Sequence, residues 1–245
     1  MSEKINSPSR INQIIAKAPQ FSPNESTFEV WAKIFNIVED RPTIKSTKVT
    51  YYLQLLQQEV LITREHLKKT NIPQIRYSAA LSDLEEAFSP HWLTQPWNLV
   101  LQYLNTATVV SLGWVEDSLP SEENDVTESE LEEVSNLINE LELSLEDSKL
   151  PTSLILVIKN LIYLMREAID RYPISGARAL RSAMTNCYGE LVLVKEELNK
   201  NPSDETSKLK KVWDKFTSVV ENAGKVDSAI SIGKKILEFS LTFLP

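Results

Sequence analysis

The sequence predicts an all-α protein of about nine to ten helices, packed as a multi-helix bundle. Apolar residues recur at spacings of three and four along nearly the whole chain. No segment alternates apolar and polar residues with a period of two between turn signals. Glycine is scarce, with five among 245 residues, where roughly 7% is usual. Scarce glycine argues against sheet turns and phosphate-cradling loops together, which leaves long helices.

Five helices are predicted in the first half. The first has Pro8 in its opening turn, and the second begins with a capping box of Ser26 and Glu29. Proline-containing breaks then separate the later helices. The predicted ranges are 8–18, 26–40, 44–70, 77–88 and 96–117. The second helix is expected to bury one apolar face made of Phe28, Trp31, Ile34, Phe35 and Val38.

The second half is predicted to hold five more helices. Thr127 and Glu130 form another capping box, Pro151 opens the most apolar helix, and Ser175 is the expected cap of the helix that follows. That helix has a packing seam with four-three spacing, formed by Leu180, Met184, Cys187, Leu191, Val194 and Leu198. Gly224 is expected to end the next helix, and a last one covers 226–244.

We expect two packed helical halves rather than one continuous bundle. An N-terminal helical half, 1–118, is joined by an acidic linker, 119–127, to a C-terminal helical bundle, 128–245. The polar N-terminus lacks the apolar stretch of a signal peptide, and no uncharged apolar run of about 18 residues occurs. The single cysteine fits a reducing compartment, so we expect a cytoplasmic protein.

The residues that usually carry catalysis form no recognisable pattern. His66 and His91 lack the Glu-x-x-His spacing of helical di-iron sites. Cys187 occupies a core position, where burial should raise the pKa of its thiol. We therefore predict no catalytic residue, no cofactor and no metal site, and favour a non-enzymatic chain. A helical enzyme or nuclease whose active site is assembled from scattered residues stays open as a third class.

Charge is distributed unevenly along the chain. Residues 1–76 carry 11 basic and 7 acidic side chains, and residues 149–245 carry 15 and 11. Residues 77–148 have 16 acidic side chains and no Lys or Arg. The candidate docking residues for a basic protein partner are Glu122, Glu123, Asp125, Glu128, Glu132 and Glu133. A solvated helix face, or an internal counterpart to the basic flanks, would explain the same residues.

A basic patch is the second candidate surface, made of Arg178, Arg181, Lys208, Lys211 and Lys215. Nucleic acid is not the expected ligand, because the basic stripe is sparse and the isoelectric point is near 5.0. The third candidate is the C-terminal helix, where Ile236, Phe239 and Phe243 are expected to contact a membrane or a second copy of the chain. Burial within the protein explains the same apolar residues without lipid and is the favoured interpretation.

Two functions follow from these surfaces. The leading hypothesis is a non-enzymatic interaction or regulatory protein, such as an adaptor, an immunity protein or an antitoxin-like factor with a defence role, that docks a basic partner through its acidic middle. The alternative is a switchable membrane-active effector that uses the apolar helix 226–244.

Overall fold

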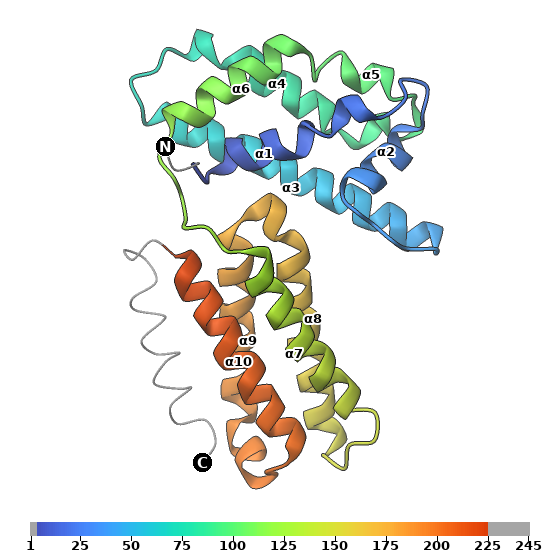
Figure 1. The fold of residues 1–245 in the computed structure, drawn as a ribbon, viewed down its shortest axis with the longest axis vertical. Helices are drawn as coiled ribbons and strands as arrows, with labels where there is room; N and C mark the ends of the chain where they lie inside the picture. The colour runs from blue at the N-terminus through green and yellow to red at the C-terminus, as the bar shows by residue number, and fades with distance from the viewer. Residues whose placement is uncertain (1–3, 225–245) are drawn as a thin grey trace. The chain divides into compact units, whose positions relative to one another are not determined.

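The computed structural model describes residues 4–224 (Figure 1). Within this range the chain forms ten α-helices, three short 3-10 helices and no strand, which confirms the all-α prediction. The α-helices are α1 (Ser7–Ile15), α2 (Thr27–Ile34), α3 (Pro42–Lys68), α4 (Ser78–Ala87), α5 (Asn98–Leu101), α6 (Thr106–Ser118), α7 (Glu128–Ser144), α8 (Thr152–Ser175), α9 (Ala177–Lys200) and α10 (Asp204–Ala223). The predicted helix 226–244 lies outside the described residues.

The described chain divides into two compact units, each with its own apolar core. The first unit runs to Glu122 and includes Pro173–Ser175; the second comprises Glu123–Tyr172 and the chain from Gly176 onward. The boundary falls inside the segment 119–127. Leu119, Glu123 and Val126 of this segment are nevertheless buried, so it is not a freely solvated linker.

The first unit packs α1 against α3 and α6, and α4 against the same two helices. An aromatic cluster fills the space beside α2. The Trp31 ring stacks on Phe35 with 5.4 Å between ring centroids, and it meets Phe88 and Trp97 edge-on at 5.8 and 5.3 Å. Edge-to-face ring contacts have a preferred geometry, so they fix the positions of these side chains more closely than apolar contact alone would.

Three predictions for this unit are wrong in detail. The helix predicted over 96–117 is broken into α5 and α6, because the Asn105 side chain accepts a hydrogen bond from the Thr108 amide and starts a new helix. Ser26 makes no capping hydrogen bond. Val38 is 96% exposed, because α2 ends at Ile34 before its apolar face reaches that position.

The second unit is an antiparallel four-helix bundle of α7, α8, α9 and α10 (Figure 1). The capping box of Thr127 and Glu130 is confirmed at the start of α7. The predicted seam of α9 is also confirmed: its six positions are buried, except that Val194 is half-buried. Ser175 is not a cap, because α8 continues through it and the chain turns at Gly176 instead.

Candidate interaction surface

Glu122, the first of the predicted docking residues, is held inside the first unit. Its Oε2 lies 2.9 Å from Arg10 Nη2, and its Oε1 accepts hydrogen bonds of 3.1 Å from the Ser7 amide and hydroxyl. Burial alone would raise the pKa of this carboxyl, but the Arg10 guanidinium and the Ser7 donors outweigh it, so the pKa is lowered. The Glu122 carboxylate is thus engaged by its own chain.

Arg10 organises a partly buried charged cluster that we define as Ser7, Arg10, Glu59, His66 and Glu122. Arg10 Nη2 lies 3.1 Å from Glu59 Oε2, and the Glu59 side chain is 0% exposed. His66 Nδ1 lies 3.4 Å from Glu122 Oε1. The sequence analysis did not predict this cluster. The sequence does contain a signal for it, because Arg10 and Glu59 each occupy a position on the apolar stripe of a helix. Arg10 falls between Ser7 and Ile14, and Glu59 falls between Leu56 and Thr63.

The geometry of this cluster does not support nucleophilic catalysis. In a serine–histidine–carboxylate relay the histidine stands between the hydroxyl and the acid. Here Glu122 stands between Ser7 and His66, and its carboxylate accepts from Ser7, so the three groups are not in the order of that relay. The cluster pairs the buried Arg10 guanidinium with two carboxylates of the first unit.

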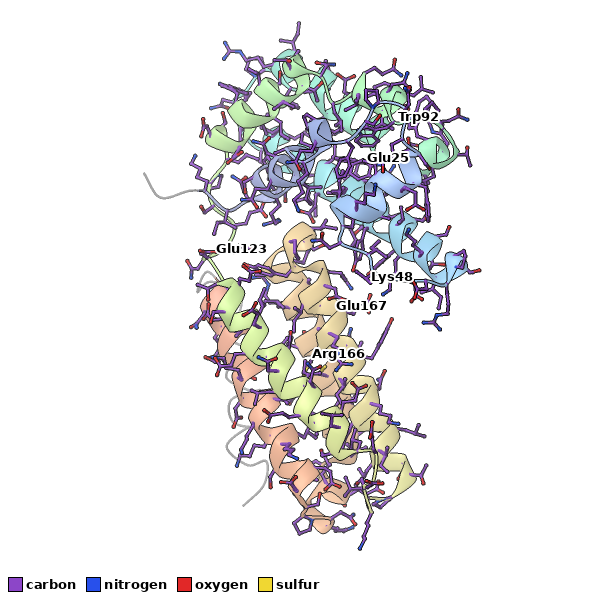
Figure 2. The ribbon with its side chains drawn as sticks, turned by 45° about the vertical axis from the view of Figure 1, so that its right-hand side comes forward. Glu25, Lys48, Trp92, Glu123, Arg166 and Glu167 are labelled. Carbon is purple, nitrogen blue, oxygen red and sulfur yellow. The ribbon has the colours of Figure 1, made fainter. Side chains whose placement is uncertain are left out.

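Glu123 is held inside the second unit by a different contact. Its Oε2 accepts a 2.6 Å hydrogen bond from the Ala177 amide, the first residue of α9. Gly176 precedes Ala177 and carries no side chain to cap the helix, so Glu123 supplies the acceptor from a distant part of the sequence. Figure 2 labels this residue at the start of the segment that leads into α7.

The other four predicted docking residues, Asp125, Glu128, Glu132 and Glu133, are exposed. Glu133 Oε2 lies 2.5 Å from Lys215 Nζ of α10. No described cation pairs with the other three. Farther along α7, Glu142 pairs with Arg166, labelled on α8 in Figure 2, at 2.7 Å. The bundle therefore neutralises some carboxylates of α7 and leaves others open to solvent.

The five residues of the predicted basic patch fall into two separate groups. Arg178 and Arg181 lie in the first two turns of α9, whereas the three lysines lie between the second and fourth turns of α10. A short connection makes these helices antiparallel, so Arg181 lies level with the far end of α10, about 18 Å from Lys211 along the bundle. Lys208 also pairs with Asp204 at 2.6 Å, which reduces the free charge further.

The remaining candidate side chains occupy ordinary surroundings. Burial, helped by nearby Glu190, raises the pKa of the Cys187 thiol to about 12, as the sequence predicted in direction. His91 Nδ1 lies 2.7 Å from the Ser89 hydroxyl, and its ring packs on Trp92 at 4.0 Å. Within residues 4–224, no group of three or more His, Cys, Asp or Glu could hold a metal ion.

The third predicted surface lies outside the range that the structure describes, since Ile236, Phe239 and Phe243 all follow Gly224. Among the described helices, none is long and apolar enough to cross a bilayer. Comparisons with protein-family models, curated proteins and solved structures give no match to this chain.

Proposed function

We propose that this chain is a non-enzymatic helical interaction protein that docks a basic protein through the second unit. The docking surface is the exposed acidic face formed by Asp125, Glu128 and Glu132, with Glu133 at its edge. A regulator, an adaptor or an immunity or antitoxin-like protein would act in this way, by occupying a partner rather than by catalysis.

The proposal rests on the unpaired negative charge at the start of α7. Asp125, Glu128 and Glu132 are exposed and have no ion-pair partner among the described residues. The chain contains no Lys or Arg between Arg76 and Lys149, so α7 has no cation of its own to screen them. Clustered like charges create a potential that raises the association rate of an oppositely charged partner.

The capture experiment compares the wild type with a double charge reversal, Glu128→Lys with Glu132→Lys. The full-length chain is immobilised, and a lysine- and arginine-rich helical peptide and extracts of the native cells are passed over it at low and high salt. We expect the wild type to retain the peptide and a basic protein at low salt. It should lose both at 0.5 M salt, because the Debye length falls to about 4 Å. The reversal variant should retain neither, even at low salt.

The matched control makes the same change in net charge elsewhere. Glu86→Lys with Glu196→Lys alters two exposed carboxylates that lie on α4 and α9, outside the acidic face. This control should retain the peptide and the basic protein. Equal capture by the wild type and the reversal variant, or equal loss in both variants, would remove the acidic face as the docking surface.

A further inference from the structure

The C-terminal segment, residues 225–245, begins beside the acidic face of the second unit. Gly224, the last described residue, forms an antiparallel bridge with Glu123. Two hydrogen bonds of 3.0 and 3.2 Å also run from Asn124 to backbone carbonyl oxygens in the last turn of α10. The end of α10 is therefore tied to the stretch of chain that leads into α7 (Figure 1). Asp125, the first residue of the acidic face, comes next in that stretch.

The carboxylates around this point divide into engaged and open ones. Glu123 and Glu130 accept hydrogen bonds from backbone amides of the second unit. Asp125, Glu128 and Glu132 are exposed and have no ion-pair partner among the described residues. Like charges that lie close together without a counter-ion repel one another, so a cation placed on the acidic face lowers the electrostatic free energy of the bundle.

The C-terminal segment brings cations of its own. Lys225 follows Gly224 directly, and Lys234 and Lys235 stand together farther along. Residues 225–235 carry these three lysines and one carboxylate, so this stretch has a net charge of +2. Opposite charge on the face and on the stretch that starts beside it favours this segment as the occupant of the face.

The lysines reach the acidic face from the point where the segment begins. Lys234 and Lys235 follow Gly224 by 10 and 11 residues, which is about 15–17 Å in the helix that the sequence predicts for this segment. Glu128 follows Glu123 by five residues, so at about 3.4 Å per residue it lies no more than about 17 Å from it. The two sets of charges thus lie at comparable distances from the bridge between the two chain segments.

We propose that residues 225–245 dock on the acidic face of the same chain through their three lysines. The segment then competes with the basic partner, which has to displace it in order to bind. The docking stands without the proposed function, whereas the competition rests on it. Single ion pairs at a surface are weak between separate molecules, but a covalently attached segment binds at a high effective concentration, so a few of them are sufficient.

Zero-length cross-linking of the full chain tests the docking, because a carbodiimide joins a lysine amine to a carboxylate only where the two groups touch. We expect cross-links from Lys225, Lys234 or Lys235 to the carboxylates of the acidic face at low salt, located by peptide mass spectrometry. The pair of Lys208 and Asp204, 2.6 Å apart on α10, is the internal reference. Relative to it, the yield should fall by about fivefold or more in 0.5 M salt, where the Debye length is about 4 Å.

The charge-reversal variants separate the acidic face from other carboxylates. Glu128→Lys with Glu132→Lys should reduce the cross-links of the segment by about fivefold or more at low salt, because like charges then face each other. The control, Glu86→Lys with Glu196→Lys, should keep the wild-type yield. Equal yields in the wild type and both variants would overturn the docking. Cross-links found only in dimers would overturn it as well, because the segment of a second copy would then occupy the face.

The competition is tested from the side of the segment. Lys234→Glu with Lys235→Glu should release the segment and lower the Kd of the basic peptide by about fivefold or more at low salt, measured by fluorescence anisotropy of the labelled peptide. Lys17→Glu with Lys48→Glu makes the same change in net charge at two exposed positions of the first unit. This control measures the general effect of a more negative protein. Equal Kd values for the two variants would refute the competition.

The two experiments distinguish this contact from the proposed function. Cross-links to the acidic face without any binding of the basic peptide, even in the variant Lys234→Glu with Lys235→Glu, would refute the proposed function and support the intramolecular contact. Binding of the peptide without such cross-links would refute the contact and leave the proposed function standing.

Discussion

At the scale of single residues, charged side chains that look alike in the sequence differ in whether the fold buries them. Arg10 and Glu59 are both buried, and Arg10 Nη2 lies 3.1 Å from Glu59 Oε2. A buried ion pair contributes little net stability, but removing one partner leaves an uncompensated charge. The neighbouring residues Glu122 and Glu123 show the same effect, since each has an internal donor and neither is free for a partner.

Loss of Arg10 should therefore destabilise the first unit strongly. We expect Arg10→Met to lower its free energy of unfolding by about 3–5 kcal/mol, measured by urea denaturation. Lys17→Met, at an exposed position just after the same helix, is the control and should change stability by less than about 0.5 kcal/mol. A similarly small change for Arg10→Met would contradict a stabilising role for the buried pair.

Glu122 should make the first unit sensitive to acid. Its pKa is lowered in the folded state, so its stabilising contribution is present above the ordinary glutamate pKa of about 4.3 and is lost as pH falls through the lower folded value. The stability difference between the wild type and Glu122→Gln should thus be largest at neutral pH and shrink below about pH 4.3. Glu86→Gln, at an exposed position of α4, should give a difference that does not follow this pattern.

The Cys187 thiol should be inert in the folded protein. Its side chain is fully buried and its pKa is raised to about 12. A thiol reagent at pH 8 should label Cys187 only after denaturation, and at a rate that follows unfolding of the second unit. Rapid labelling of the native protein would contradict the burial of this residue.

At the scale of helices, local sequence rules hold where no tertiary contact competes with them. Thr127 with Glu130 and Ser26 with Glu29 are the same motif, yet only the first forms a capping box. Ser26 instead bridges to Pro96, and the Glu29 carboxylate lies 2.7 Å from Lys45 of α3. The sequence could predict the helices and the seam of α9 from their periodicity. It could not reveal that Glu122 and Glu123 are engaged inside the protein, because their partners, Arg10 and Ala177, are far away in the chain.

The turn between α8 and α9 depends on a glycine. Gly176 has φ 57° and ψ −153°, a region that side-chain-bearing residues almost never adopt. We expect Gly176→Ala to cost about 1–3 kcal/mol of stability. Gly189→Ala is the control, and its effect on stability should have the opposite sign. Gly189 lies within α9, and a Cβ at this position meets no atom within 4 Å. The substitution should therefore raise the free energy of unfolding by about 0.5–1 kcal/mol. Urea denaturation by circular dichroism measures both.

At the scale of the whole molecule, the two cores can be followed separately. Trp31, Trp92, Trp97 and Trp114 belong to the first unit, and Trp213 belongs to the second. In a Trp213→Phe background, fluorescence reports the first unit and far-ultraviolet circular dichroism reports both. Leu161→Ala removes buried volume from the second core and should cost that unit about 2–5 kcal/mol.

In that background we expect Leu161→Ala to move part of the circular dichroism transition to lower urea while the fluorescence transition changes less. Leu53→Ala, which removes the same side chain from the first core, should shift the fluorescence transition instead. A single transition that shifts equally by both probes in both variants would show that the two cores unfold as one.

The paired carboxylates at the boundary also decide where the chain can be divided. A fragment that ends at residue 118, where the sequence alone places the end of the first half, loses Glu122 and leaves Arg10 with one carboxylate fewer. A fragment that begins at residue 128 loses Glu123, and the first amide of α9 then has no acceptor. Isolated halves that aggregate would thus report a misplaced cut rather than an inability to fold. A cut between Glu122 and Glu123 keeps both carboxylates with their partners, but it still separates Pro173–Ser175 from the first unit to which they belong.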